Sequence, residues 1–321
     1  MALSDLQVFS EKLYDSYLET LSYQLELFNA ATQGGLVLTT GAMQGDFETK
    51  ALWTRIPNLV RRRNVYDPTA SLTPTKLGMK STSKVKVAGG TNPVELDSYQ
   101  FTWIRKSPEE AAMVLSKQLA EDSMADMVST AINAFVAAIG AQATNVYDGS
   151  AGVASLAGLN SAASKMGDRA QDILCWVMNS KSAFDIWGAA IVNANNLFTY
   201  GTVNISRDAM GRPIVITDNP ALVNLTPTPD IYRTLGLTSG AVVVEQNDND
   251  FQSEIVPGVG KQNISKTFQA EWTFNLSVKG FTCDMTNGGA SPSDAAIATA
   301  TNWDKVATSH KDLAGILANF Q

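Results

Sequence analysis

The sequence predicts a mixed α+β fold that is organised around one long helix. Three observations support this prediction: a helical pattern over residues 107–142, apolar runs typical of strands on both sides of it, and turn-rich segments between the runs. The pattern opens with Ser107 and Pro108, which suit the cap and the first turn of a helix. At about 1.5 Å per residue the helix would be roughly 50 Å long, so it must cross a domain or support other elements.

The size and composition predict a folded protein with two subdomains. The chain has 321 residues, of which 45% are hydrophobic and only 17% are charged, and its formal net charge is -7. Such a chain can use much of its surface against neighbouring molecules. Residues 1–5 lack the basic region and the apolar run of a secretory signal, and no segment approaches about 18 continuous apolar residues. We therefore expect synthesis in the cytosol and no contact with a membrane.

Residues 1–34 show a helical period before the chain reaches Gly34 and Gly35. Apolar side chains recur three or four positions apart, among them Leu13, Tyr17 and Leu21. A stripe this wide must be covered. Two alternatives remain open at this point: the stripe packs on its own domain, or it forms an arm that lies on a neighbouring subunit.

A long β-hairpin is predicted before the helix, at about 66–105. Residues 83–87 alternate between polar and apolar, residues 89–93 supply turn residues, and residues 94–104 resume the alternation. The second strand places three aromatic side chains on one face: Tyr99, Phe101 and Trp103. Because an isolated two-stranded ribbon is marginally stable in water, we expect another surface, its own or a partner's, to support the hairpin.

The densest positive charge in the chain is Arg61-Arg62-Arg63. Phosphate binding is one interpretation of such a triplet. The chain is acidic, however, and neither a basic helix nor an aromatic platform accompanies the triplet. We therefore favour pairing with carboxylates, either within the chain or between subunits.

A compact α/β subdomain is predicted after the long helix. Residues 172–178 form a short apolar run typical of a buried strand, residues 183–188 fit a capped helix, and residues 212–217 fit a second strand. The boundary of the subdomain is expected near 226–229, although 231–237 could still belong to it.

The sequence pattern in the last third of the chain predicts mostly strands. Residues 241–244 fit a strand, residues 268–285 fit one or two extended strands of which 268–278 alternate, and Gly280 fits a bend. Trp272 and Phe274 lie on one face of this second strand, and we expect that face to lie along the long helix.

The C-terminal segment is expected to be helical. Residues 302–306 and 310–320 fit short helices that follow an Ala-rich stretch. His310 lies here, and an exposed position at a helix start is favoured over a role as a base or a ligand.

The chain lacks the residues of a recognisable catalytic or metal site. His310 is its one histidine, and Cys175 and Cys283 are far apart among apolar or β-prone residues, which favours buried free thiols. Residues 257–261 resemble the end of a phosphate loop, but Gln262 stands where Ser or Thr would hold magnesium. We therefore expect no catalytic residue, no cofactor and no metal.

The order of these parts resembles the Hong Kong 97-type fold of tailed-bacteriophage major capsid proteins, which encapsulin shells and herpesvirus capsids share. The shared order is a helical arm, a β-hairpin, a long spine helix, a central α/β subdomain and a late return of extended strand near Val278-Lys279-Gly280-Phe281. The local similarities are in 172–178, 211–218 and 268–281. The resemblance covers nearly the whole chain and rests on the order of its structural elements.

The resemblance implies a division of the chain into consecutive parts. These are an N-terminal arm (1–34), an extended-loop region (35–106, with the hairpin at about 66–105), a peripheral domain with the spine helix (107–148), an axial domain (149–240), peripheral-domain strands (241–288) and a C-terminal helical segment (289–321).

The resemblance also implies a function. The chain would be a major capsid protein that self-assembles into the pentamers and hexamers of an icosahedral phage head, assembled in the host cytoplasm around double-stranded DNA and located in the virion. Candidate inter-subunit contacts are Leu13, Tyr17, Leu21, Arg61, Arg62, Arg63, Lys84, Lys86, Tyr99, Phe101 and Trp103.

Further partners follow from the same resemblance. A separate scaffolding protein is expected because the chain starts almost at once with the arm. Portal and decoration proteins are additional partners, and the packaged DNA would be touched by weak, non-specific contacts.

Two alternatives stay open. An encapsulin-like cargo compartment would form shells without a scaffolding protein. An enzyme or small-molecule binder built on the central α/β subdomain would require a pocket with convergent polar groups.

Overall fold

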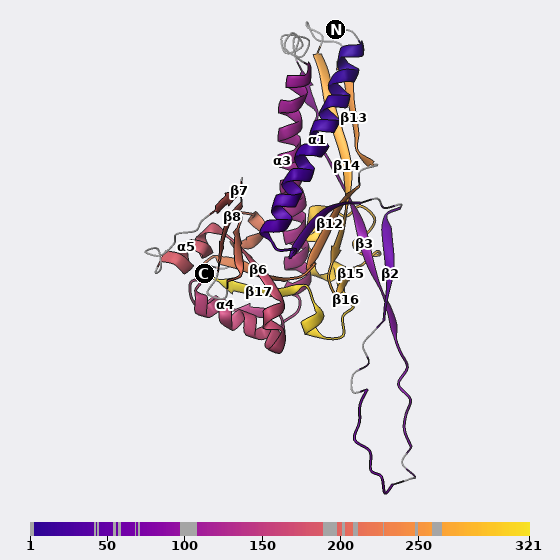
Figure 1. The fold of residues 1–321 in the computed structure, drawn as a ribbon, viewed down its shortest axis with the longest axis vertical. Coiled ribbons are helices and arrows are strands. Elements are labelled where there is room, and N and C mark those ends of the chain that lie inside the picture. Colours follow the sequence, from indigo (N-terminus) through magenta and orange to yellow (C-terminus); the bar gives the residue numbers. More distant parts are fainter. Residues whose placement is uncertain are drawn as a thin grey trace.

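The computed structural model of the chain describes residues 3–41, 43, 45–53, 56, 59–67, 69, 71–96, 108–188, 198–200, 203–207, 211–226, 228–247, 250–258 and 265–321. Within these residues the chain forms two large sheets around one long helix, α3 (Pro108–Gly140). Helix α1 (Leu3–Ala31) lies beside α3, and strands of one sheet run alongside these two helices (Figure 1). The other sheet lies beside the C-terminal end of α3.

Helix α3 confirms the predicted long helix. It begins at Pro108 and ends at Gly140, within two residues of the expected ends, while the expected cap, Ser107, lies outside the described residues. The C-terminal half is buried on more faces than a single apolar stripe would require, because alanines such as Ala131, Ala134 and Ala138 fill the faces between the larger side chains. By length and composition alone the helix could span a membrane, but 61% of its apolar window is buried inside the fold, as expected of a core helix.

The stripe on α1 is covered by the chain's own α3 and neighbouring strands. Leu13, Tyr17 and Leu21 are at most 1% exposed and belong to the core that α3 also lines. The Tyr17 hydroxyl donates to Ser123 Oγ at 3.2 Å and accepts from Gln246 Nε2 at 3.0 Å. These buried hydrogen bonds fix the register of α1 against the spine, which favours the first of the two alternatives for the stripe.

Among the described residues, seven strands form the sheet beside α1 and α3. Their order is β1-β12-β14-β3-β2, and β13 and β4 pair with the remaining length of β14. As expected, the face of β14 that carries Trp272 and Phe274 is buried, and β14 contacts α3. The bounds are β1 (Leu36–Gly41), β2 (Phe47–Trp53), β3 (Met79–Gly90), β4 (Val94–Leu96), β12 (Val242–Asn247), β13 (Gln252–Gly258) and β14 (Ser265–Val278).

The prediction of a hairpin at about 66–105, with its turn at 89–93, is wrong. Strands β3 and β4 follow one another in the same direction along β14, so residues 91–93 interrupt a strand and do not reverse the chain. The Thr91 N–H donates to the Ala270 carbonyl at 2.8 Å, and its Oγ1 accepts from the Ala270 N–H at 2.9 Å. Pairing along the long strand β14 therefore outweighs the local turn signal of the Gly, Asn and Pro residues. The hairpin partner of β3 is β2, which is antiparallel to it.

Eight strands form the second sheet within the described part of the chain, in the order β5-β17-β11-β6-β9-β8-β7, with β10 paired to β11. The strands predicted at 172–178 and 212–217 are β6 and β9, which lie parallel, and the helix predicted at 183–188 lies within α5. The bounds are β5 (Val146–Asp148), β6 (Ile173–Met178), β7 (Phe198–Tyr200), β8 (Val203–Arg207), β9 (Pro213–Ile216), β10 (Val223–Asn224), β11 (Ile231–Thr238) and β17 (Gly315–Phe320).

Short helices and a small third sheet complete the described fold. Strand β15 (Phe281–Cys283) pairs with β16 (Trp303–Lys305) after a bend at Gly280, whose φ of 83° confirms the predicted turn. The helices are α4 (Leu156–Ala163), α5 (Ser180–Gly188) and α6 (Asp294–Ile297), with 3-10 turns η1 (Ser164–Asp172), η3 (Pro220–Leu222), η5 (Ala300–Asn302) and η6 (His310–Asp312).

The helices predicted at 302–306 and 310–320 are wrong, because the end of the chain is β16 and β17. Strand β17 lies between β5 and β11 and is buried on both faces, so it lacks the alternation by which a strand is recognised. Gly315 opens this strand, and a Cβ there would lie 2.0 Å from the Gly236 carbonyl oxygen. The close approach of β11 and β17 therefore requires glycine at this position.

Replacing Phe135 with Ala should lower the free energy of unfolding by about 3–5 kcal/mol, because this ring is fully buried in the core around α3. Urea denaturation followed by circular dichroism measures the change. Met113→Ala on the same helix is the matched control, since Met113 is 64% exposed; it should change stability by no more than about 0.5 kcal/mol. Similar losses in both variants would contradict the assignment of the core.

Candidate functional site

The first candidate is the part of the loop between β2 and β3 that the structure describes, residues 56, 59–67, 69 and 71–78; it is called the extended loop below. Figure 1 shows it projecting from the β2–β3 hairpin, away from both large sheets. Val60 is 91% exposed and Tyr66 is 94% exposed. Other large apolar side chains of the loop with more than half of their surface exposed are Leu59, Val65, Leu72 and Leu77. A long loop with this much exposed apolar surface is typical of a binding segment.

The extended loop also carries the arginine triplet. Arg61, Arg62 and Arg63 are all exposed, and no carboxylate among the described residues forms an ion pair with them. The described acid of the loop, Asp67, accepts hydrogen bonds from Thr69. The loop therefore presents positive charge and apolar surface together.

Ion pairs fix the base of the hairpin. Lys84 Nζ on β3 lies 2.7 Å from Glu245 Oε1 on β12 and 3.6 Å from Glu48 Oε2 on β2. Because β14 lies between β3 and β12, the contact between Lys84 and Glu245 spans a strand, whereas Glu48 lies on the strand next to β3. Lys86 Nζ lies 2.8 Å from Asp250 Oδ2. The two predicted contact lysines therefore pair within the chain and set the direction in which the hairpin leaves the sheet.

These pairs shift the ionisation of their members. Burial lowers the pKa of Lys84, but the hydrogen bond and the charge of Glu245 outweigh it, so the net pKa lies above its ordinary value. The hydrogen bonds from Lys86 and then Thr273 lower the pKa of Asp250. Both groups are therefore charged at neutral pH.

A groove at the Gly90 end of β3 is the second candidate, and it is called the acidic groove below. Its volume is about 510 Å³, and the charged residues among its described lining are carboxylates, Asp250 and Glu271. The remaining lining is the glycine-containing end of β3, residues 88–90, with Thr91, Gln252, Gln269, Trp272 and Thr273. Gln269 Nε2 donates to Glu271 Oε1 at 3.1 Å, and Glu271 is exposed.

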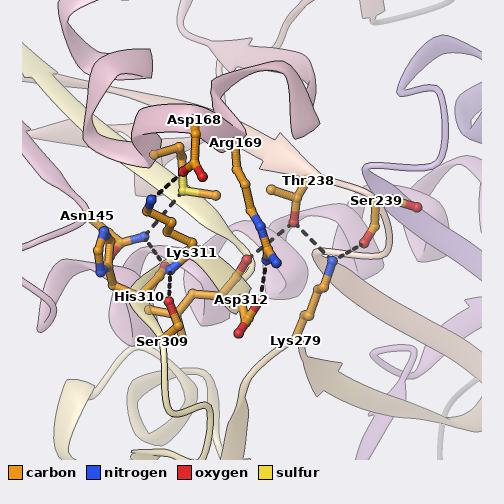
Figure 2. A network of polar contacts seen from close by, with 12 residues as sticks. Asn145, Asp168, Arg169, Thr238, Ser239, Lys279, Ser309, His310, Lys311 and Asp312 are labelled. Atoms are coloured by element: carbon orange, nitrogen blue, oxygen red, sulfur yellow. Dashed lines mark hydrogen bonds and ion pairs between the residues drawn. The ribbon is translucent and has the colours of Figure 1, made fainter. Parts of the chain in front are cut away.

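A third candidate is the junction where the chain crosses between the two large sheets (Figure 2). Asn145, which follows α3, is fully buried, and its Nδ2 donates to the carbonyl oxygens of His310 at 3.0 Å and Gly315 at 2.8 Å. Thr238 Oγ1, at the end of β11, donates to the Ala314 carbonyl at 2.9 Å. These bonds tie three crossing segments together, and His310 contributes its backbone carbonyl to them.

Two ion pairs lie on the surface of this junction (Figure 2). Arg169 pairs with Asp312, and Lys311 pairs with Asp168, so η1 and η6 are linked twice by opposite charges. The hydrogen bond from Lys311 lowers the pKa of Asp168, and the hydrogen bond to Asp312 raises the pKa of Arg169. Because these groups are largely solvated, we assign the pairs a role in orientation and little stability.

The two cysteines are free and buried, as expected. Burial raises the pKa of Cys175 to about 12 and that of Cys283 to about 11, so both are inert thiols at neutral pH. Within the described residues, no group of three or more His, Cys, Asp and Glu side chains could hold a metal ion.

The structure separates the candidate contact residues into groups. Leu13, Tyr17 and Leu21 lie in the chain's own core, Lys84 and Lys86 lie in ion pairs at the base of the hairpin, and Arg61, Arg62 and Arg63 are exposed on the extended loop. Tyr99, Phe101 and Trp103 lie outside the described residues. The sequence analysis missed the apolar side chains of the extended loop. Residues 47–53 show no alternation between polar and apolar side chains, so the sequence carries no clear signal for β2 or for the loop that follows it.

Comparisons with known proteins report likenesses to phage capsids. A family model described as Gp13-like, major capsid protein 13-like, matches residues 5–317. A comparison with curated proteins finds no match. The solved Cyanophage Pam1 capsid asymmetric unit is 11% identical, with 87% of this chain and 85% of that chain covered and a TM-score of 0.53. The acidic stable capsid structure of Helicobacter pylori bacteriophage KHP30 is 10% identical, with 91% and 89% covered and a TM-score of 0.47.

Asp250→Asn should lower stability at neutral pH by up to about 1 kcal/mol, the range of a partly exposed ion pair. The fold depresses the pKa of Asp250, so its stabilisation is present above the ordinary value of about 4 and is lost as the pH falls through the folded pKa. Urea unfolding should therefore separate variant and wild type at neutral pH and bring them together in acid. Glu254→Gln on β13 is the control, and the same pH dependence in that variant would contradict the assignment.

Asn145→Ala should lower the free energy of unfolding by about 1–3 kcal/mol, because the buried Gly315 carbonyl and the partly buried His310 carbonyl lose their donor. Thr308→Ala is the control, because it removes an exposed hydroxyl near the same junction, and it should cost no more than about 0.5 kcal/mol. Urea unfolding of both variants is the measurement. Equal stability of Asn145→Ala and wild type would mean that water replaces the amide and that the junction is not held by it.

Proposed function

The chain belongs to the Gp13-like family of phage major capsid proteins, and from this membership we propose that it builds the head as pentamers and hexamers around double-stranded DNA. It is a major capsid protein of a phage head, a structural component of the virion and not an enzyme. Its fold is the Hong Kong 97 type expected from the sequence. The family membership favours a phage head over the two alternatives, a cargo compartment and an enzyme.

The proposal of close self-association rests on the exposed side chains of the extended loop. Its large apolar side chains and its three arginines are exposed in the single chain. Exposed apolar patches of this kind mark protein–protein contacts. A second copy of the chain is the partner that a shell subunit always has available. We therefore assign the loop to the surface of the neighbouring subunit.

Charge complementarity supports the acidic groove as the place where the arginines bind. Of the two carboxylates in the groove, Asp250 is already paired with Lys86, whereas Glu271 is exposed, and guanidinium groups pair well with carboxylates. The groove lies at the end of β3 that is opposite the extended loop. From Met79 to Gly90 this strand extends about 36 Å at about 3.3 Å per residue, and the loop projects in the other direction (Figure 1). The groove of a neighbour is therefore the better match.

The two large sheets correspond to the domains that we propose. The peripheral domain contains α1, α3 and the sheet with β14, and the axial domain contains the sheet with β6 and β11. Strands β5 and β17 extend the axial sheet beyond residues 149–240 on both sides of the sequence. We propose that the axial domains of five or six copies gather around the symmetry axes of the shell.

Other partners belong to the same proposal. A separate scaffolding protein would direct assembly, and portal and decoration proteins would bind the finished head. The chain carries a net charge of -7 and few charged residues, so its contacts with packaged DNA would be weak and non-specific.

Expression followed by electron microscopy tests the assembly proposal. The chain should form closed shells when it is produced with its scaffolding protein, and their symmetry shows the pentamers and hexamers directly. A strictly monomeric protein under every assembly condition would count against it.

Replacing all three arginines with Ala (Arg61→Ala, Arg62→Ala, Arg63→Ala) should weaken assembly and leave the monomer folded. At about 0.5 kcal/mol per exposed pair, three lost pairs weaken each contact by roughly tenfold. Light scattering against protein concentration measures the assembly threshold, and thermal unfolding measures the monomer. Lys76→Ala in the same loop is the matched control.

A charge exchange identifies the partner surface. Glu271→Lys should impair assembly, and combining it with Arg62→Glu should restore part of it, because opposite charges again face each other. If the arginine variants assemble poorly but the exchange never rescues, the loop binds another part of the neighbour. If the arginine variants assemble normally, the triplet is not a contact.

A further inference from the structure

The loop that joins β15 to α6 contains the one Asn-Gly pair of the sequence, Asn287-Gly288. In such a pair the backbone nitrogen of the glycine, which no neighbouring Cβ shields, can attack the side-chain amide carbon of the asparagine. A bond forms between this nitrogen and Cγ, the bond from Cγ to Nδ2 breaks, and ammonia leaves with the proton from the glycine nitrogen. Water then opens the cyclic imide to aspartate or isoaspartate. Asn287 is exposed, so water has access to it.

Asp284 holds each group that would react. Its carboxylate accepts a hydrogen bond from Asn287 Nδ2 at 2.6 Å, and it also accepts from the backbone N–H groups of Thr286 at 2.7 Å and Asn287 at 3.3 Å. Its backbone carbonyl accepts from the Gly288 N–H at 2.9 Å. The attacking nitrogen and the leaving amide are therefore both bound by one residue. The hydrogen bonds, the Thr286 amide first, lower the pKa of Asp284 and keep its carboxylate ionised at neutral pH.

We propose that Asn287 is a latent site of deamidation and that Asp284 suppresses its conversion to aspartate or isoaspartate. Attack requires the Gly288 nitrogen to lose its proton, and the hydrogen bond to the Asp284 carbonyl opposes that loss. Attack also requires the asparagine side chain to turn its Cγ towards this nitrogen, and the hydrogen bond from Nδ2 to the Asp284 carboxylate restrains that rotation. Asp284 is thus a positioning residue. This proposal does not depend on shell assembly.

Conversion would expose Cys283, which the same loop covers. Cys283 is 5% exposed, and a Cβ on Gly288 would lie only 3.4 Å from its sulfur, so the backbone of Gly288 packs directly on the thiol. Isoaspartate adds a methylene to the main chain, and either product places a second negative charge beside Asp284. Both changes favour opening of the loop, because like charges repel and the hydrogen bond from Nδ2 is gone.

Mass-spectrometric peptide mapping of the full-length chain tests the proposal. The wild type, Asp284→Ala and the matched control Asp304→Ala are incubated at mildly alkaline pH beside a synthetic peptide of residues 281–292. The wild type should deamidate more slowly than the peptide, and Asp284→Ala should react about fivefold faster than the wild type or more. That factor corresponds to the loss of about one net hydrogen bond, about 1 kcal/mol. Asp304→Ala should match the wild type.

A wild-type rate equal to that of the peptide would overturn the proposal, and this comparison holds even if Asp284→Ala does not fold. A folded Asp284→Ala that reacts at the wild-type rate would overturn the role of Asp284. Asn287→Asp, made directly, should make Cys283 react with a thiol reagent while Cys175, which is fully buried, stays unreacted. Unchanged reactivity of Cys283 in that variant would contradict the opening of the loop.

Discussion

The burial of the C-terminal half of α3 is the constraint on which the rest of the structure depends. This half of the helix is apolar around most of its circumference, so one sheet alone cannot cover it. The core around it contains Leu235 and Leu237 from β11 as well as Val242 and Val244 from β12. Because β11 belongs to one large sheet and β12 to the other, the two sheets are packed on a common helix. Their relative position is therefore set by side-chain packing, which resists small displacements.

Polar groups at the junction make this arrangement specific. The chain must cross between the sheets several times, and each crossing leaves backbone carbonyls that water cannot reach. Asn145 and Thr238 satisfy carbonyls on the segment that leads into β17. A buried carbonyl that loses its donor costs free energy, so the crossings cannot shift independently of one another. The rigid body that results can present its loops in a fixed direction.

The surface of this body is incomplete in a single chain. The extended loop leaves large apolar side chains and three arginines exposed, while the acidic groove at the other end of β3 leaves Glu271 exposed. The ion pairs of Lys84 and Lys86 hold the hairpin between these two surfaces. Such a division, with stability inside the subunit and unmet contacts at its extremities, suits a capsid protein, because subunits must fold before they meet.

The sequence by itself determined the long helix, the late strand along it and the strands β6 and β9, because each has a clear period or a short apolar run between turn signals. It also determined the family's order of parts. Only the tertiary structure decided the partner of β3, since the turn residues at 89–93 are local signals and pairing with β14 is a long-range interaction. The same is true of β17, whose residues are buried on both faces and therefore show neither a helical nor an alternating pattern. The arginine triplet was visible in the sequence, but its position on a projecting loop follows from the pairing of β2 with β3, which no local pattern specifies.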